Sequence, residues 1–199
     1  HRGGAVVTKT TDIRTPEGEL YPEMARGAIA DLAGVSADQV ILGPNVPALY
    51  SALVAAMRPM LRRSSTVVLN PLDRAPLTAR LQRAGMEEKW AQVDLATGDL
   101  PAWQYAEIAD GSTRLVSVPA AHAELGNVVG VSGIVDAVRE KSRAWVLVDA
   151  TAYAPYRPLD LDAWGADVAA VDVGVPVLAA IGNKTVSDGA LLTLSLIHI

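Results

Sequence analysis

VLVDATAYAPYRPLDL spans residues 146–161, and this stretch decides the fold. It opens with an apolar run that ends abruptly on Asp149, and a loop with two tyrosines and two prolines follows. A run that is apolar at every position predicts a strand covered on both faces of its sheet. The sequence therefore raises the question of why such a strand ends on a carboxylate.

Patterns typical of strands and of helices alternate on both sides of this stretch. Several other strands are also continuous apolar runs, and repeated β–α units predict an α/β fold: a doubly wound, mostly parallel sheet with helices on both faces. Ligands bind outside the carboxyl ends of the strands in such sheets, and Asp149 lies at one of these ends. We expect strands at residues 39–43, 65–70, 89–95, 113–118, 144–149 and 166–172, a hairpin of 177–181 with 189–194, and helices at 22–34, 45–61, 77–84, 101–109 and 131–141.

The composition indicates a globular chain and disfavours several classes of function. Half of the 199 residues are apolar, and the net charge of −5 argues against a nucleic-acid surface. The absence of Cys excludes disulfides and thiolate metal sites from this sequence, and His1 and His198 are too far apart in the chain to suggest zinc held by three His. No apolar run reaches the roughly 18 residues of a membrane span. We therefore expect a cytoplasmic protein without metal, membrane or nucleic-acid partners.

The two ends of the sequence predict an internal piece of a longer protein. The chain does not open with Met, and it closes on LLTLSLIHI, an apolar run with no turn or tail after it. LSLIHI also resembles the translation of an adapter used in DNA library preparation. We therefore expect residues 1–193 to form part of one large domain and residues 194–199 to be a non-native tail. The alternative is that the last residues form a C-terminal edge strand.

The order of the phrases resembles the large domain of one enzyme family. RGAIADLAG precedes a strand and the turn LGPN, and STVVLNPLDR, KWAQVDLATGDLPAWQ, STRLVSV and AWVLVDATAYAPYRPLDLDAWGADVAAVD follow. This succession is similar to class V aminotransferases of fold-type I, and especially to their cysteine desulfurase-like branch, over about residues 20–193. The resemblance implies pyridoxal 5'-phosphate (PLP) as cofactor, an amino acid as substrate and a homodimer when full length.

Asp149 matches the Asp of that family that pairs with the pyridine nitrogen of PLP. The charge of this Asp keeps the nitrogen protonated, so that the ring can accept electrons from the substrate. The resemblance thus assigns Asp149 to cofactor binding. The residues alone leave a second interpretation, in which Asp149 caps the following turn through its side chain.

Two further positions match cofactor contacts of the family. GPNV at 43–46 aligns with the turn that binds phosphate at a helix N-terminus, which makes Asn45 a candidate cofactor residue. The alternative for Asn45 is an ordinary N-cap. Arg74 aligns near a ring-stacking His, and a guanidinium group can also stack on a ring. The alternative for Arg74 is a solvated loop residue.

The lysine that binds PLP covalently in this family has no counterpart at its matching position, Val175. The next lysine is Lys184, in the polar stretch NKTVSDG, which makes Lys184 a candidate catalytic residue and, alternatively, a residue of a surface turn. Two polar cofactor contacts of the family align with Ala152 and Ala123. His122, beside Ala123, is a candidate base or a solvent-facing side chain.

The sequence leaves two functions open. The first is a class V aminotransferase or cysteine desulfurase-like enzyme that performs PLP-dependent transferase chemistry on an amino acid. The second is a non-catalytic binding or scaffold homologue of the same fold. Nucleotide-binding proteins and serine hydrolases are disfavoured, because the sequence contains no GxGxxG, GxxxxGKS or GxSxG motif.

Overall fold

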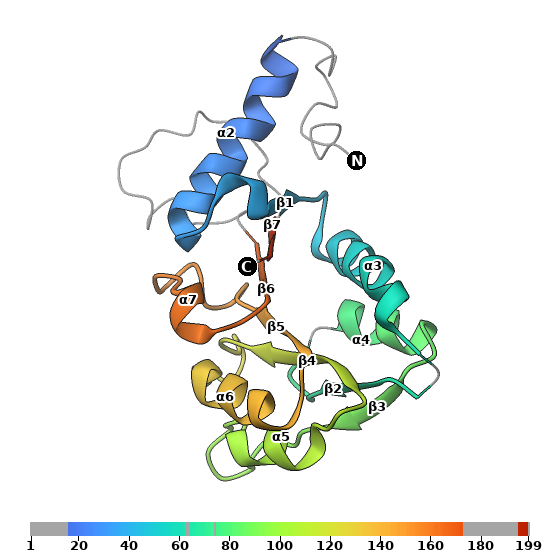
Figure 1. The fold of residues 1–199 in the computed structure, drawn as a ribbon. Helices are drawn as coiled ribbons and strands as arrows, with labels where there is room; N and C mark the ends of the chain where they lie inside the picture. The colour runs from blue at the N-terminus through green and yellow to red at the C-terminus, as the bar shows by residue number, and fades with distance from the viewer. Residues whose placement is uncertain (1–15, 63, 74, 173–194, 199) are drawn as a thin grey trace.

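The computed structural model describes residues 16–62, 64–73, 75–172 and 195–198. The strands in these ranges form one sheet with the order β1-β7-β6-β5-β4-β2-β3 (Figure 1). The strands are β1 (Val40–Leu42), β2 (Thr66–Leu69), β3 (Glu87–Trp90), β4 (Thr113–Pro119), β5 (Trp145–Asp149), β6 (Val168–Val171) and β7 (Ser195–His198). The helices are α2 (Pro16–Ala33), α3 (Val46–Met57), α4 (Ala75–Arg83), α5 (Ala102–Ile108), α6 (Val131–Lys141) and α7 (Leu161–Trp164), with short 3₁₀ turns η1 (Ala37–Gln39) and η2 (Arg58–Met60).

The centre of the sheet is parallel, as the continuous apolar runs predicted. β3, β2, β4, β5 and β6 all pair in parallel, and β7 is antiparallel to both of its neighbours, β6 and β1. β5 is an interior strand with its last residue, Asp149, in register with Pro119 of β4 and Ala170 of β6. The carboxyl ends of three neighbouring strands therefore meet around Asp149.

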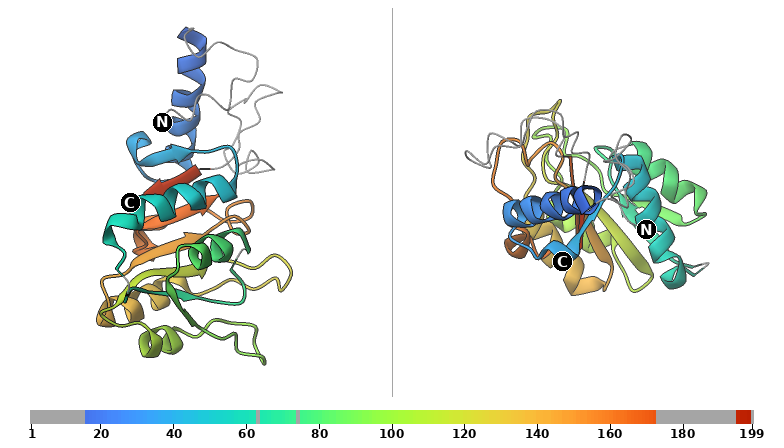
Figure 2. Two further views of the ribbon diagram at one scale, coloured as in Figure 1. Left: turned by 90° about the vertical axis from the view of Figure 1, so that its right-hand side faces the viewer. Right: turned by 90° about the horizontal axis from the view of Figure 1, so that it is seen from above.

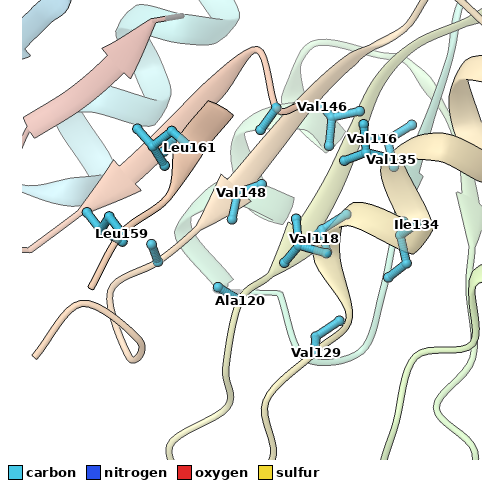
Figure 3. Packing of buried hydrophobic residues seen from close by; sticks show 14 of the residues in the cluster. Val116, Val118, Ala120, Val129, Ile134, Val135, Val146, Val148, Leu159 and Leu161 are labelled. Atoms are coloured by element: carbon cyan, nitrogen blue, oxygen red, sulfur yellow. The ribbon is translucent and has the colours of Figure 1, made fainter. Parts of the chain in front are cut away.

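Helices cover both faces of the sheet, which confirms the predicted doubly wound fold. Alternate residues of a strand point to opposite faces. Val146 and Val148 of β5 accordingly pack in a cluster with α5, α6 and α7, whereas Leu147 packs on the other face with α3 and α4. Figure 2 shows these helices on either side of the sheet, and Figure 3 shows Val135 of α6 against the valines of the central strands. None of the described helices is long and apolar enough to cross a bilayer.

Three predicted elements have an end more than two residues from the observed one, and one of them is the helix predicted at 45–61, which ends at Met57 before the 3₁₀ turn η2. The first helix begins at Pro16 instead of residue 22, and Pro22 lies inside it. The third strand was predicted at 89–95 but forms at Glu87–Trp90, because an edge strand extends only as far as its partner, here Thr66–Leu69 of β2. Three of the four residues of β3 are charged, so a search for apolar runs does not place this strand correctly. Charged side chains are common on edge strands, where they hinder pairing with other molecules.

The C-terminal predictions lie mostly outside the described residues. The expected hairpin of 177–181 with 189–194 falls there entirely. Residues 195–198 form β7, which lies between β1 and β6 and not at the edge of the sheet. The interpretation of residues 194–199 as a non-native tail stays a prediction.

One surface cluster fixes the start of β5, the strand that carries Asp149. Arg139 of α6 donates to the carbonyl oxygen of Ala144 at 2.6 Å and to Asp167 Oδ2 at 2.6 Å. The same oxygen of Asp167 accepts the backbone N–H of Val146 at 2.7 Å. The cluster thus ties α6 to the chain entering β5 and to the chain entering β6.

We expect Arg139→Ala to lower the free energy of unfolding by about 1–2 kcal/mol, because it removes the hydrogen bonds of a charged donor to Ala144, Asp167 and Gly165 at a partly buried site. Urea denaturation followed by circular dichroism measures the effect. Arg143→Ala is the matched control, since Arg143 is exposed on the same connection. Equal unfolding midpoints for the two variants would contradict the assigned role of Arg139.

Candidate functional site

A cavity of about 960 Å³ lies at the carboxyl ends of the central strands. Its walls come from the residues that follow β2, β4, β5 and β6, so it occupies the position where parallel α/β sheets bind ligands. The lining residues include Asp73, Pro119, His122, Ala123, Glu124, Asn127, Asp149, Thr151, Ala152, Tyr153, Tyr156, Arg157 and Asp172.

Asp149 lies on the inner wall of this cavity. As the second residue after Leu147 it points to the same face of the sheet, the face under α3. Its side chain is 8% exposed, and Oδ2 accepts a hydrogen bond of 2.8 Å from the hydroxyl of Tyr50 in α3. Oδ1 accepts the backbone N–H of Thr151 at 2.9 Å. The structure therefore shows the turn contact expected from the residues alone, together with a carboxylate that lines the cavity.

Asp73 is a second carboxyl group of the cavity, and sequence analysis did not identify it. It follows β2, where its Oδ2 accepts the backbone N–H of Asn70 at 2.9 Å. Its Oδ1 accepts the hydroxyl of Ser117 in β4 at 2.7 Å. Asn70 is itself fixed, because its amide donates to the carbonyl oxygen of Ser117 at 3.1 Å. These contacts hold Asp73 at the cavity from two neighbouring strands.

Burial changes the acidity of Asp73. Desolvation raises the pKa of this carboxyl group to about 7, and the nearby charge of Asp149 adds to the effect, whereas the hydrogen bonds from Ser117 and Asn70 oppose it. Asp73 therefore titrates close to neutral pH. Tyr105 of α5 lies beside this group, and burial also raises its pKa. The Tyr105 hydroxyl has no hydrogen-bond partner of good geometry among the described residues.

Of the other predicted site residues Asn45, Arg74 and Lys184, the structure describes only Asn45. Asn45 is the N-cap of α3, where its Oδ1 accepts the backbone N–H of Ala48 at 2.8 Å, and the described cavity wall does not include it. Asn45 therefore has the geometry of an ordinary N-cap, the alternative to cofactor binding that the sequence left open. Arg74 and Lys184 lie outside the described residues, so their cofactor-binding and catalytic roles stay predictions.

Two small side chains stand on the cavity wall at positions where the resemblance places polar cofactor contacts. Ala152 and Ala123 both line the cavity, and neither offers a hydrogen-bonding side chain. His122 lines the cavity as well, and its Nδ1 accepts the backbone N–H of Leu125 at 3.3 Å, which leaves it in a loop-capping geometry. Arg157 contributes a guanidinium group from the loop after β5.

Tyr50 and Asp73 are the site residues that sequence reasoning missed. Tyr50 belongs to the apolar face of α3, where a tyrosine looks like an ordinary core residue, and its partner Asp149 is 99 positions away in the chain. Asp73 had one local signal: it lies in the loop after a buried strand, four residues beyond Leu69 at the end of β2. A search for carboxylates after each apolar run would have identified it.

Solved structures of other proteins share this α/β fold. The solved structure of a NifS-like protein superimposes with a TM-score of 0.77 at 20% identity, over 99% of this chain and 54% of that chain. A C-DES mutant with glycine covalently linked to its PLP cofactor matches with a TM-score of 0.77 at 17% identity, over 99% and 52% of the two chains. These likenesses confirm the predicted fold.

The sequence itself matches the family Aminotransferase class-V over residues 17–172. The Mycobacterium tuberculosis (strain CDC 1551 / Oshkosh) protein "Uncharacterized protein MT3887" is 37% identical over 154 residues, which cover 75% of this chain and 38% of that protein. The chain belongs to the class V aminotransferase family, whose members depend on PLP. It spans about two fifths of the length of this relative and about half of the two solved structures.

Proposed function

We propose that this protein binds PLP in the cavity at the carboxyl ends of the sheet and acts as a PLP-dependent transferase on an amino acid. The observation that carries the proposal is the Asp149 carboxylate, which ends an interior strand, is almost fully buried and lines the cavity. A carboxylate in this position can hold a protonated pyridine nitrogen, because opposite charges stabilise each other strongly where water is excluded. The bound cofactor would supply an electron sink for the substrate carbanion.

The residues around Asp149 fit such a ring in part. Tyr50 holds one carboxylate oxygen in place, so the acceptor is pre-positioned for a ring nitrogen. Thr151 Oγ1 and Asn127 Oδ1 are buried without a hydrogen-bond partner among the described residues, and both residues line the cavity. Buried polar atoms of this kind are usually satisfied, which favours a polar ligand beside them. Arg157 offers a guanidinium group, the geometry that binds phosphate or carboxylate by two hydrogen bonds.

A second candidate function is a non-catalytic homologue that keeps the fold and part of the cavity. Ala152 and Ala123 favour it, because both line the cavity at positions of polar cofactor contacts without supplying one. Val175, at the position that matches the family lysine, also favours the non-catalytic homologue. In this case PLP would bind weakly and without a covalent bond, since a lysine amine both anchors the cofactor and moves the substrate proton.

The homodimer and the amino acid substrate belong to the same proposal. Both come from the family resemblance, and the chain covers only part of the length of its relatives. In a dimer of this family type the cavity would lie near the second copy, which could complete the site. Size-exclusion chromatography with light scattering tests the dimer directly.

Titration of the purified protein with PLP, followed by borohydride reduction and peptide mass spectrometry, separates the two candidates. We expect saturable binding that shifts the visible absorbance of PLP. A reduced PLP adduct on Lys184 that Lys184→Ala abolishes would support the enzyme. Saturable binding with no adduct on any lysine would support the non-catalytic homologue. Absence of saturable binding would contradict the proposed site, and Lys141→Ala, in the last turn of α6, serves as the matched control.

A further inference from the structure

We propose that His122 is a hydrogen-bond donor of the cavity: its imidazole ring carries the proton on Nε2 and gives this N–H to an anionic oxygen of PLP. The inference rests on the proposed function for its ligand, whereas the position of the proton concerns the protein alone. It replaces the candidate role of a base, which the sequence left open, by that of a donor. It stands on the hydrogen bonds that the loop after β4 makes around this residue.

The loop after β4 holds the backbone of His122 in a closed turn. The N–H of His122 donates to the carbonyl oxygen of Asn127 at 3.2 Å, and its carbonyl oxygen accepts the N–H of Gly126 at 2.8 Å. Gly126 has a φ of 70°, the left-handed region that glycine adopts most readily. The side-chain amide of Asn127 donates to the carbonyl oxygen of Gly98 at 2.6 Å, which ties this loop to its neighbour. The backbone that carries the imidazole ring is therefore fixed on both sides.

The same turn determines which nitrogen of the ring carries the proton. Nδ1 of His122 accepts the backbone N–H of Leu125 at 3.3 Å. A neutral imidazole has one nitrogen with a proton and one without, and the nitrogen that accepts a hydrogen bond is the one without. The proton therefore lies on Nε2. A proton on Nδ1 would face the N–H of Leu125 and break this contact.

Nε2 is the ring nitrogen that remains for a ligand. It lies across the imidazole ring from Nδ1, so it is directed away from the backbone of Leu125, and His122 lines the cavity. Nε2 has no hydrogen-bond partner among the residues that the structure describes. The buried carboxyl groups of the wall, Asp149 and Asp73, each accept two hydrogen bonds from other residues. The Nε2–H group is thus a donor of the cavity wall that the fold itself does not use.

An anionic ligand needs such donors, because the cavity wall is rich in acceptors. Four of its residues carry carboxyl groups: Asp73, Glu124, Asp149 and Asp172. PLP carries negative charge on its phosphate group and on its ring oxygen, and a partly buried anion is stabilised where N–H or O–H groups face its oxygens. His122 and Arg157 bring nitrogen donors to this wall from the loops after β4 and β5. Ala123, the neighbour of His122, has no side-chain donor.

Nitrogen-15 NMR of the ligand-free protein measures the position of the proton at about pH 8, where imidazole is neutral. The chemical shift of each ring nitrogen differs between its protonated and unprotonated forms. We expect His122 to carry its proton on Nε2 alone. Loss of signals in His122→Asn identifies those of His122 among the three histidines of the chain. A proton on Nδ1, or the mixture of both forms found in free histidine, would overturn the inference, whatever the result with PLP.

Two matched variants separate the contact with the loop from the contact with the ligand. Asn can place an oxygen near the position of Nδ1 and has no atom at the position of Nε2, whereas Gln can place an N–H near Nε2 and has no acceptor at Nδ1. We expect His122→Asn to bind PLP about tenfold more weakly than the wild type, with an unchanged unfolding midpoint in urea. His122→Gln should bind PLP nearly as the wild type does, with a lower midpoint. Equal PLP affinities of His122→Asn and wild type would overturn the inference and leave the proposed function intact.

Pyridoxal, which lacks the phosphate group, distinguishes the two anionic oxygens of PLP. If His122→Asn loses affinity for PLP and not for pyridoxal, the Nε2–H group contacts the phosphate. An equal loss for both ligands places the contact on the ring oxygen. A loss of affinity that comes with a lower unfolding midpoint in His122→Asn would give His122 a structural role and overturn the inference. Absence of PLP binding in the wild type would overturn the ligand contact together with the proposed function.

Discussion

Asp149→Asn should weaken PLP binding by about 10- to 100-fold, because a charge-assisted hydrogen bond contributes about 1.5–3 kcal/mol and each 1.4 kcal/mol is tenfold in affinity. The amide is neutral and can no longer compensate a protonated ring nitrogen. Its oxygen can still accept one of the two hydrogen bonds that Asp149 makes with Tyr50 and Thr151, which keeps the surrounding structure in place. Fluorescence titration with PLP measures the change.

The matched control is Asp162→Asn. Asp162 is exposed in α7 and belongs to the same segment of the chain, so the two variants change the net charge by the same amount. We expect Asp162→Asn to bind PLP like the wild type. If Asp149→Asn binds PLP with wild-type affinity and has the circular dichroism spectrum of the folded wild type, this carboxylate does not hold the ring.

The sheet was predictable from sequence because its signal is local. β4, β5 and β6 are buried at nearly every position, so hydrophobicity alone marks them as interior strands. β3 was misplaced because it lies at an edge, where half-exposed and charged residues replace the apolar run. α7 was not predicted, since a single turn of helix offers too few residues for a 3.6-residue period.

Only the part of the candidate site that lies on a single strand could be predicted from the sequence. Asp149 stands at the end of its own apolar run, so its place at the carboxyl end of the sheet follows from one segment. The contacts that define the site join distant segments: Tyr50 reaches Asp149 across 99 positions, and Ser117 reaches Asp73 across 44. Such pairs depend on strand order and register, which the hydrophobic pattern does not encode.

The ligand-free protein should lose stability as pH rises from about 4 to about 7, because Asp73 binds its proton more tightly in the folded state. Its pKa is about 7 in the folded protein and 3.8 when unperturbed, so the folded state holds more protons in this range. Stability falls with pH wherever the folded state binds more protons than the unfolded state. A shift of about three pKa units corresponds to a loss on the order of 4 kcal/mol, fully developed above about pH 7.

Asp73→Asn should remove this dependence, because an amide resembles the protonated carboxyl group and does not titrate. Its oxygen can accept the N–H of Asn70, and the hydroxyl of Ser117 can rotate to accept from the amide. Urea denaturation between pH 4 and 8 should therefore show the variant more stable than the wild type at pH 8 and similar at pH 4. Asp110 does not obscure the comparison: hydrogen bonds from Lys89 and Ser112 lower its pKa, so its contribution is lost only in acid. Parallel pH profiles for wild type and Asp73→Asn would contradict a proton on Asp73 at neutral pH.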